Sequence, residues 1–213
     1  MNDSTPTLLR PLARSFYEPS ARTVAPQLLG HWLVRRTAVG LSGGLIVETE
    51  AYLADDPSCH GYRGETRRNR AMFGPPGHAY VYFIYGNHWC FNAVCSPSGT
   101  AEAVLLRAIE PSFGVGWMQQ RRPVAKARDL TNGPAKFCAA LAIDRELDHA
   151  DLCDDASPIQ IAENPERAQL LKQRGPIITT TRVGLSQAAD WPLRFYLEGS
   201  VFVSRRAVRV AAT

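Results

Sequence analysis

The order of the hydrophobic patterns predicts an α+β fold, in which helices surround one antiparallel β-sheet. Strand patterns cluster in the first half of the chain, helix patterns begin after about residue 112, and strand patterns return near the C-terminus. The 213 residues are 45% hydrophobic and 21% charged, a composition typical of a globular domain with a sizeable core. The sequence contains no repeat or linker. We therefore expect a single compact domain over residues 13–208, with flexible tails at residues 1–12 and 209–213.

The first half of the chain contains most of the expected strands. Residues 23–36 precede them and are expected to form a short helix, with Thr23 as its N-cap and Pro26 in its first turn. LSGG, residues 41–44, is expected to be a turn. The strands predicted from apolar, β-branched and aromatic residues are 45–53, 79–85, 88–94 and 102–111.

The second half changes in character. Its apolar spacing predicts three helical segments, and β-branched and aromatic residues then predict a return to strands. The helical segments are 113–122, 133–143 and 163–174, and the later strands are 179–186 and 193–204.

A hairpin is expected where AYVYFIY and HWCFNAV flank Gly86-Asn87, a strong signal for a two-residue turn. Tyr85 stands at the tip of this hairpin. A large ring at such a place is either incidental or a wedge that enters the DNA minor groove and unstacks bases. The sheet is therefore expected to carry a protruding hairpin that could insert into DNA.

The strand LIVETEAYL, residues 45–53, has two carboxylates in its middle. Because side chains alternate along a strand, Glu48, Glu50 and Tyr52 share one face. An edge strand with a solvated face would explain this pattern. The alternative is the floor of a cleft, where a carboxylate is held beside an aromatic ring.

Arg107 lies among apolar residues in AVLLRAI and needs an acidic partner, because an unpaired buried charge costs several kcal/mol. Glu50 needs a partner for the same reason, and we expect the two to face each other. Arg107 would then favour the ionised form of Glu50, ready to accept a proton. A buried ion pair without any chemistry is the other interpretation.

Two further segments have polar groups that suit a ligand. Asn92 lies in the apolar strand WCFNAV, where it either hydrogen-bonds to backbone or touches the edge of a ligand. Gly133 and Lys136 lie in NGPAK, which resembles a helix start with free N–H groups and a nearby lysine. Such a start either is capped in the ordinary way or binds a phosphate.

The charge is unevenly distributed. The formal net charge is +4, with basic runs at residues 61–70 and 121–128 and an acidic run at residues 144–155. A basic side of this kind suits a protein that offers one face to phosphate groups, although each run alone could be a solvated loop. Arg67, Arg68 and Arg70 are the expected contacts to a DNA backbone.

The five cysteines are odd in number and show no CxxC spacing, which argues against a disulfide framework and a structural zinc site. Reduced cysteines, no signal-peptide core and no apolar run of about 18 residues lead us to expect a cytoplasmic protein outside the membrane. Asp55, Asp56, Cys59 and His60 lie close together, but their spacing fits no standard metal site. We expect no metal and no cofactor.

The sequence as a whole resembles the alkyladenine (3-methyladenine) DNA glycosylase family, the type found in mammals and many bacteria, and this chain is similar to a bacterial member. The resemblance extends from about residue 15 to 204, with the motifs in family order. The matching motifs are VETEAYL, the His60 loop, RRNRAMFGPPG, YVYFIYG, CFNAV, VLLRAIEP, NGPAKFCAALAI, RVGLS and PLRFYLEGS.

The resemblance implies a monofunctional enzyme without a cofactor that flips damaged purines out of duplex DNA and removes them, leaving an abasic site. The family's substrates are 3-methyladenine and other alkylpurines, hypoxanthine and ethenoadenine. By this resemblance Glu50 is the general base that activates water, and Arg107 helps to hold that water. A monomer near the nucleoid suits such an enzyme.

The resemblance also implies how the base is held. Tyr52, His60 and Tyr82 match residues that stack on the flipped base, Tyr85 matches the intercalating residue, and Asn92 matches a residue that crowds out the 2-amino group of guanine. The hairpin tip departs from the mammalian pattern, because Asn87-His88 replaces a bulky apolar pair. Two other classes stay open: a non-catalytic nucleic-acid-binding module, and a metal hydrolase that uses Cys59, His60 and the nearby aspartates.

Overall fold

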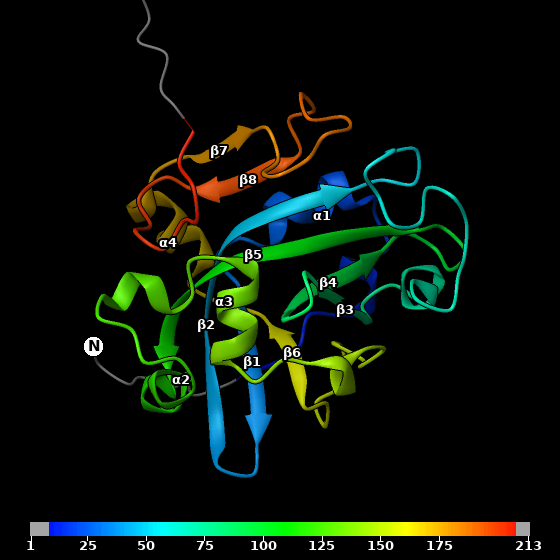
Figure 1. Ribbon diagram of the computed structural model, residues 1–213. Helices are drawn as coiled ribbons and strands as arrows, with labels where there is room; N and C mark the ends of the chain where they lie inside the picture. Colours follow the sequence, from blue (N-terminus) through cyan, green and yellow to red (C-terminus); the bar gives the residue numbers. More distant parts are fainter. Residues whose placement is uncertain (1–8, 208–213) are drawn as a thin grey trace, which may run out of the picture.

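The computed structural model describes residues 9–207, and within them eight strands form one antiparallel sheet around which the helices pack (Figure 1). The strands lie in the order β3-β4-β5-β2-β1-β6, while β8 pairs with β2 and β7 pairs with β8. This is the predicted α+β class. The strands are β1 Trp32–Thr37, β2 Gly40–Tyr52, β3 Ala79–Ile84, β4 His88–Cys95, β5 Glu102–Phe113, β6 Ile159–Ala162, β7 Ile177–Thr180 and β8 Arg194–Leu197.

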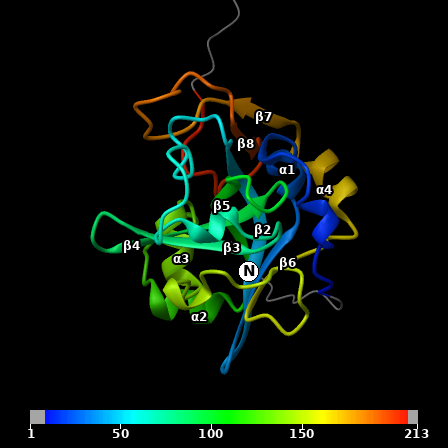
Figure 2. The same ribbon diagram turned by 90° about the vertical axis from the view of Figure 1, so that its right-hand side faces the viewer.

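Four α-helices flank the sheet in the described part of the chain: α1 Ala21–Leu28, α2 Val115–Arg121, α3 Pro134–Ala140 and α4 Arg167–Arg174. Figure 2 shows α1 and α4 on one side of β2 and α2 and α3 on the other. None of the helices between residues 9 and 207 is long and apolar enough to cross a bilayer.

The long strand β2 organises the sheet. Along one edge it pairs with β5, and along the other edge it pairs first with β1 and then, over Glu48–Glu50, with β8. The register between β2 and β5 shifts on both sides of Glu48, which marks a β-bulge. Glu48 and Glu50 therefore lie inside the sheet, and the edge-strand interpretation of this segment is wrong.

The helix expected over residues 23–36 is shorter and begins earlier. Ser20 is the N-cap of α1, and its side chain accepts a hydrogen bond from the Arg22 N–H at 3.4 Å. The carboxylate of Glu102, from the start of β5, also accepts from the Ser20 hydroxyl and from the Ala21 N–H. The second half of the expected helix is the strand β1, because its pairing with β2 and β6 outweighs a weak local helix pattern.

Two expected boundaries also differ. LSGG is part of β2, and the turn lies before it, between β1 and Gly40. A Cβ on Gly43 would lie 2.3 Å from the Leu33 carbonyl oxygen, and one on Gly44 would lie 2.2 Å from that of Glu110. These glycines therefore permit close strand packing, not a turn. The strand expected over residues 179–186 ends at Thr180, and the chain after it is irregular.

β3 and β4 pair in antiparallel register up to Ile84 and His88. The connection is therefore three residues long, Tyr85 to Asn87, where two were predicted. Tyr85 and Gly86 both have positive φ angles, of 54° and 74°, which turn the chain sharply. Figure 2 shows this connection extending away from the sheet.

The expected N-terminal tail does not reach residue 12. The Leu12 N–H donates to the Ile161 carbonyl oxygen at 2.9 Å, and the Arg10 carbonyl oxygen accepts from the Glu163 N–H at 2.8 Å. Leu12 is buried in the core. Residues 1–8 and 208–213, which include the expected C-terminal tail, lie outside the described residues.

Candidate active site

Side chains from several strands, the start of α3 and the loop after β7 enclose a cavity of about 350 Å³. Every residue predicted to hold a base or to insert into DNA lies on it, together with Arg107. We call it the aromatic cavity. Its predicted wall residues are Tyr52, His60, Tyr82, Tyr85, Asn92 and Arg107, and further wall residues are Tyr80, Pro134, Ala135, Val183 and Gly184.

Three aromatic rings pack together in one wall of the aromatic cavity. The ring centroids of His60 and Tyr82 are 4.5 Å apart, and those of Tyr80 and Tyr82 are 5.3 Å apart. Burial lowers the pKa of His60, and the nearby charge of Arg68 lowers this pKa further. Burial raises the pKa of both tyrosine hydroxyls, so all three rings are uncharged at neutral pH. Flat, neutral rings suit stacking against a planar ligand.

Tyr52 connects the aromatic cavity to buried charges. Its hydroxyl donates to Glu50 Oε2 at 3.0 Å, and the Arg182 guanidinium lies 4.7 Å from the centre of its ring. Burial and the charge of Glu50 raise the pKa of Tyr52, so the hydroxyl keeps the proton that it donates. Arg182 in turn forms a buried ion pair with Asp56. The ring is therefore fixed from its edge and from its face.

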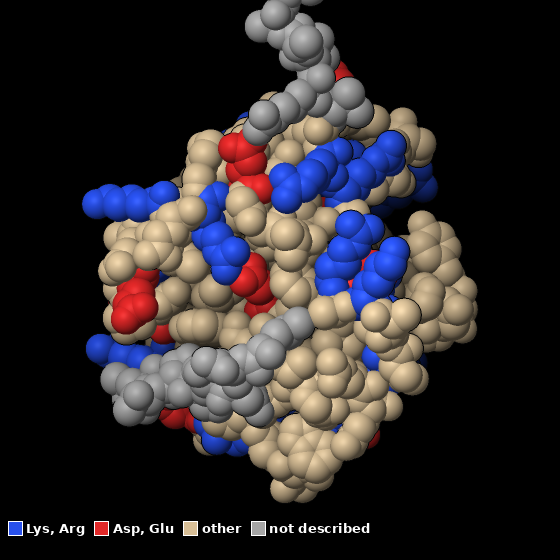
Figure 3. All heavy atoms as spheres, turned by 90° about the vertical axis from the view of Figure 1, so that its left-hand side faces the viewer, with Lys and Arg blue, Asp and Glu red and all other residues tan. Residues whose placement is uncertain are grey.

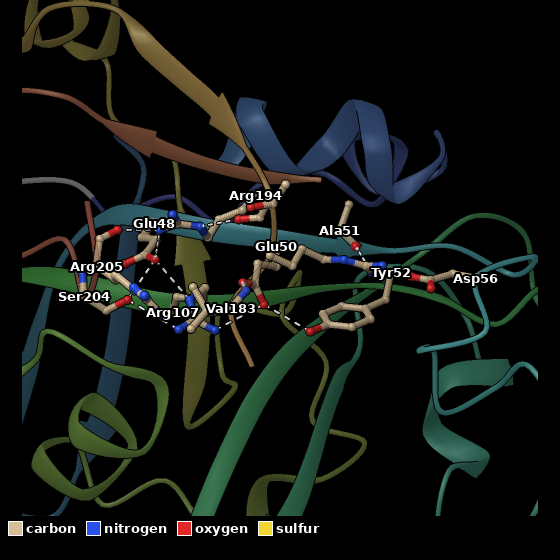
Figure 4. Close-up of polar contacts among 12 residues, drawn as sticks. Glu48, Glu50, Ala51, Tyr52, Asp56, Arg107, Val183, Arg194, Ser204 and Arg205 are labelled. Atoms are coloured by element: carbon tan, nitrogen blue, oxygen red, sulfur yellow. Dashed lines mark hydrogen bonds and ion pairs between the residues drawn. The ribbon is translucent and has the colours of Figure 1, made fainter. Parts of the chain in front are cut away.

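Glu50 is buried in the middle of β2, and its carboxylate accepts three hydrogen bonds (Figure 4). The donors are Arg107 Nη1 at 3.2 Å, the Tyr52 hydroxyl at 3.0 Å and the Val183 N–H at 2.8 Å. Three donors match the acceptor-only character of an ionised carboxylate. All three belong to residues that line the aromatic cavity. Glu50 itself is not among the lining residues, but it lies directly behind three residues that are.

Glu48 is equally buried, but most of its donors come from elsewhere. It accepts from Arg107 Nε at 3.0 Å, from Arg194 Nη1 at 2.9 Å and from the Ser204 N–H and hydroxyl at 2.6 and 2.8 Å. Only Arg107 among these donors lines the aromatic cavity. Burial opposes the charge of Arg107, yet the carboxylates of Glu50 and Glu48 outweigh burial and raise its pKa. Glu48, which lies outside the aromatic cavity lining, therefore holds the Arg107 guanidinium in place.

Asn92 and Tyr85 take different places on the aromatic cavity. Asn92 is buried on β4, and its Nδ2 donates to the Tyr80 carbonyl oxygen at 3.0 Å, so the amide is held in one orientation. Tyr85 stands at the hairpin tip with 84% of its surface exposed. An aromatic ring so exposed has no packing role within the described chain.

The predicted arginine contacts lie beside the aromatic cavity and not in it. Arg67 and Arg68 line a separate cavity with Phe83 on the other face of the hairpin strands. Arg68 Nη2 donates to the Phe83 carbonyl oxygen at 3.0 Å, and Arg70 pairs with Glu65 at 3.2 Å. All three arginines are exposed, as contacts to a DNA backbone would need to be.

Gly133 precedes α3, whose first residues Pro134 and Ala135 line the aromatic cavity. Lys136 Nζ donates to Asn132 Oδ1 at 2.7 Å. The amine is therefore held near the start of the helix. The expectation that this start binds a phosphate stays a prediction.

The residues of the metal-hydrolase alternative have other partners. Asp56 pairs with Arg182, the Cys59 thiol contacts the Ala101 carbonyl oxygen at 3.5 Å, and His60 Nδ1 lies 2.8 Å from the Tyr80 hydroxyl. Within residues 9–207, no three His, Cys, Asp or Glu side chains gather in a way that could hold a metal ion.

Several contacts at this site could not be read from the sequence. The Val183 N–H reaches Glu50 from 133 residues away, and Arg182 reaches Asp56 from 126 residues away. Ser204 reaches Glu48 across 156 residues. The RVGLS motif contains both Arg182 and Val183, but the Val183 donor is a backbone N–H, which leaves no trace in residue type, and the partner of the Arg182 side chain is distant in the sequence.

The fold and this site define a class of protein in which a cavity lined by aromatic rings lies beside a buried, charge-paired carboxylate. Residues 15–201 match the family described as Methylpurine-DNA glycosylase (MPG). The chain belongs to the methylpurine-DNA glycosylase family, which confirms the resemblance found in its motifs. Family and relatives together support a role as a DNA glycosylase in DNA repair.

Three relatives named "Putative 3-methyladenine DNA glycosylase" are similar over nearly the whole chain. The protein of Methanoculleus marisnigri is 50% identical, over 92% of this chain and 99% of its own length. The protein of Agrobacterium fabrum is 48% identical, over 91% of this chain and 92% of its own length. The protein of Carboxydothermus hydrogenoformans is 46% identical, over 92% of this chain and 99% of its own length.

Proposed function

We propose that this chain is a monofunctional DNA glycosylase that removes alkylated or deaminated purines from duplex DNA and leaves an abasic site. The observation that supports this most is the position of Glu50. Each of its three hydrogen-bond donors, Arg107, Tyr52 and Val183, lines the aromatic cavity. A base bound in the cavity would place its glycosidic bond near a fixed carboxylate.

The proposed reaction is hydrolysis with Glu50 as general base. An ionised carboxylate offers about four lone-pair positions, so three donors leave room for one water. That water transfers a proton to Glu50 as its oxygen bonds to C1′, while the C1′–N bond breaks and its electron pair leaves with the base. The negative charge of Glu50 also favours the oxocarbenium-like transition state. Arg107 holds the carboxylate and the water in place.

The proposed substrates differ in how easily they leave. 3-Methyladenine is already cationic and departs without further activation. Hypoxanthine and ethenoadenine are neutral, and hypoxanthine needs a proton at N7, which we propose comes through water. No lysine lines the aromatic cavity in the described chain, and without an amine nucleophile the product would be an abasic site and not a cleaved strand. The reaction would use no cofactor.

The aromatic rings would hold the flipped base. Tyr52, His60 and Tyr82 offer neutral faces for stacking, and Asn92 would crowd out the 2-amino group of guanine. Tyr85 would fill the gap left in the duplex. With Asn87-His88 beside it, the inserted tip would be less bulky and more polar than an apolar pair.

The proposed partner is damaged double-stranded DNA, bound through its phosphates without reading of sequence. The proposed backbone contacts are Arg67, Arg68, Arg70, Gly133 and Lys136. A monomer would suffice, since each chain has its own aromatic cavity, and we propose that it acts at the nucleoid in the cytoplasm.

Single-turnover base release from a hypoxanthine-containing duplex tests this proposal. Glu50→Gln should slow release at least about a hundredfold, because a general base contributes roughly 10²–10⁴-fold. DNA binding should be retained, since shape and polarity are kept. Glu65→Gln is the matched control, because it removes an exposed carboxylate that pairs with Arg70 and does not line the aromatic cavity.

EDTA separates the remaining classes. Release by wild type and by Glu65→Gln, unaffected by EDTA, would support a metal-free glycosylase. Loss of activity with EDTA would favour the metal hydrolase. If wild type released neither hypoxanthine nor 3-methyladenine but still bound DNA, the chain would be a non-catalytic nucleic-acid-binding module. Rapid release by Glu50→Gln would remove Glu50 as the base.

A further inference from the structure

A second cavity, of about 370 Å³, shares a wall with the aromatic cavity. Val183 and Gly184 line both cavities, so one short loop separates them. Apart from Ala207, the rest of its lining is basic or hydroxylated, and we call it the arginine cavity. Its side chains used below are Thr180, Thr181, Arg182, Arg194, Arg205 and Arg206.

Two of the four arginines are neutralised from within the protein. Arg182 pairs with Asp56, and Arg194 pairs with Glu48. Both guanidinium groups are almost fully buried. They form the buried part of the arginine cavity lining, and their positive charges are balanced by these carboxylates.

The other two arginines are exposed and lie near the C-terminal end of the described chain. Arg206 donates to the carbonyl oxygens of Glu198 and Ser200, which are neutral acceptors. The Arg205 side chain has no hydrogen-bond or ion-pair partner within residues 9–207. Figure 3 shows several Lys and Arg side chains close together on the upper part of one face of the molecule. Positive charge is therefore available at the mouth of the cavity.

The hydroxyls of Thr180 and Thr181 are further possible hydrogen-bond donors in the lining of the arginine cavity. Neither hydroxyl makes a hydrogen bond in the described chain; Thr180 is the last residue of β7 and Thr181 follows it. Two guanidinium groups with two hydroxyl donors match the oxygens of a phosphate group, which accepts several hydrogen bonds and carries negative charge.

We propose that the arginine cavity binds a phosphodiester of the DNA backbone next to the flipped nucleotide, with Arg205 and Arg206 as its main contacts. This inference rests on the proposed function, because a nucleotide whose base fills the aromatic cavity must keep its own phosphates outside that cavity. The shared Val183–Gly184 wall places the arginine cavity beside such a nucleotide. Free inorganic phosphate has the same chemistry and must be distinguished by experiment.

Such a phosphate would touch the loop that positions Glu50. The Val183 N–H donates to Glu50, and the Arg194 guanidinium donates both to Glu48 and to the Thr181 and Arg205 carbonyl oxygens. A phosphate bound between Thr181 and Arg205 would therefore contact the same loop whose Val183 N–H holds Glu50.

The test measures affinity for hypoxanthine-containing duplexes in which single phosphates beside the lesion are replaced by uncharged methylphosphonates. The double variant Arg205→Gln/Arg206→Gln should bind the unmodified duplex about tenfold or more weakly than wild type, with a salt slope smaller by about one to two. On the duplex that lacks the contacted phosphate, wild type and variant should bind equally. Arg36→Gln is the matched control, since β1 leads to the opposite end of the molecule from β7 and β8 (Figure 1).

Arg205→Lys/Arg206→Lys keeps both positive charges and should recover most of the affinity that the glutamine variant loses, which would assign that loss to charge and not to misfolding. The proposal is overturned if the glutamine variant binds like Arg36→Gln. It is also overturned if its loss is the same on every methylphosphonate duplex.

Two further arms complete the design. Inorganic phosphate that stabilises wild type but not the glutamine variant, with no effect of any methylphosphonate, would assign the cavity to free phosphate and overturn the DNA assignment. Base release by wild type is measured in parallel. If wild type releases the base but the arginine variants bind DNA like wild type, only the phosphate site is rejected. If wild type releases no base but its affinity depends clearly on one methylphosphonate position, only the glycosylase function is rejected.

Discussion

Arg107 Nη1 lies 3.2 Å from Glu50 Oε2, while the Nε of the same guanidinium lies 3.0 Å from Glu48. One arginine therefore contacts both carboxylates of β2, but each has a different environment. Glu48 also accepts hydrogen bonds from Arg194 and Ser204, whereas every donor to Glu50 within residues 9–207 lines the aromatic cavity. The structure thus distinguishes a carboxylate held mainly by residues outside the aromatic cavity from one whose described donors all line it, and the proposed reaction uses the second.

Replacing Glu48 should destabilise the fold. Glu48→Ala leaves Arg107 and Arg194 buried without their shared acceptor, and removing one partner of a buried ion pair costs roughly 3–5 kcal/mol. Urea unfolding measures this loss. Glu65→Ala, which removes an exposed ion pair with Arg70, should cost less than about 1 kcal/mol. A loss from Glu48→Ala as small as that of the control would show that the network contributes little.

Replacing Tyr85 should weaken binding of lesion-containing duplex DNA. Tyr85→Ser removes the exposed ring at the hairpin tip, and we expect a loss of up to a few kcal/mol on duplex DNA but little change on single strands. Tyr85→Phe keeps the ring and should bind like wild type. Equal losses on duplex and single-stranded DNA, measured by fluorescence anisotropy, would contradict a wedge role.

Replacing Asn92 should relax the choice of base. The Asn92 amide is fixed by its hydrogen bond to the Tyr80 carbonyl oxygen and lines the aromatic cavity. Asn92→Ser makes room there, so release of unmodified guanine should rise roughly tenfold, in line with the 1–3 kcal/mol that pocket shape contributes. Hypoxanthine release is the internal control and should change much less. Unchanged guanine release would remove Asn92 as a specificity determinant.

Stability should fall in mild acid because of His31. This side chain accepts the Asn164 N–H at Nδ1, and burial, then the charge of Arg167, lowers the pKa of His31 from 6.5 to about 4. The unfolded chain therefore binds a proton between these values while the folded chain does not. The free energy of unfolding should fall by up to about 3 kcal/mol as the pH drops from 6.5 to 4.

His31→Gln tests this origin. The glutamine does not titrate, so the variant should lose most of the pH dependence in this window, while the two proteins should show parallel stability above pH 7. Urea unfolding at pH 4.5, 5.5, 7 and 8 gives the comparison. A variant that keeps the full acid-dependent loss would place the responsible group elsewhere.

Local patterns predicted several elements correctly. The strands 45–53 and 102–111 correspond to the later part of β2 and to most of β5, because β-branched and apolar runs indicate strands by themselves. The helices α2, α3 and α4 lie within their predicted segments for the same reason. The expected contact between Glu50 and Arg107 exists, because each buried charge needed a partner and few were available.

Long-range contacts decided the rest. β1 is a strand because two neighbouring strands pair with it, and α1 begins at Ala21 because the distant Glu102 carboxylate accepts from Ser20 and from the helix start. Neither contact could be predicted from the residues near β1 or α1, because the partners lie far away along the chain. Tertiary packing overrides local propensity here, since helix propensities differ by only a few tenths of a kcal/mol per residue.

The sequence by itself determined the fold class, the family and the residue types of the site, because these follow from local periodicity and from motifs. The motifs pointed to Glu50 by resemblance, and only the tertiary structure decided which contacts distinguish Glu50 from Glu48. Glu50 and Glu48 share a strand face, and alternation alone cannot separate them. The separation comes from Val183 and Ser204, which lie more than 130 residues away along the chain. Their contacts exist only because the folded loops bring backbone N–H groups to buried oxygens that must be paired.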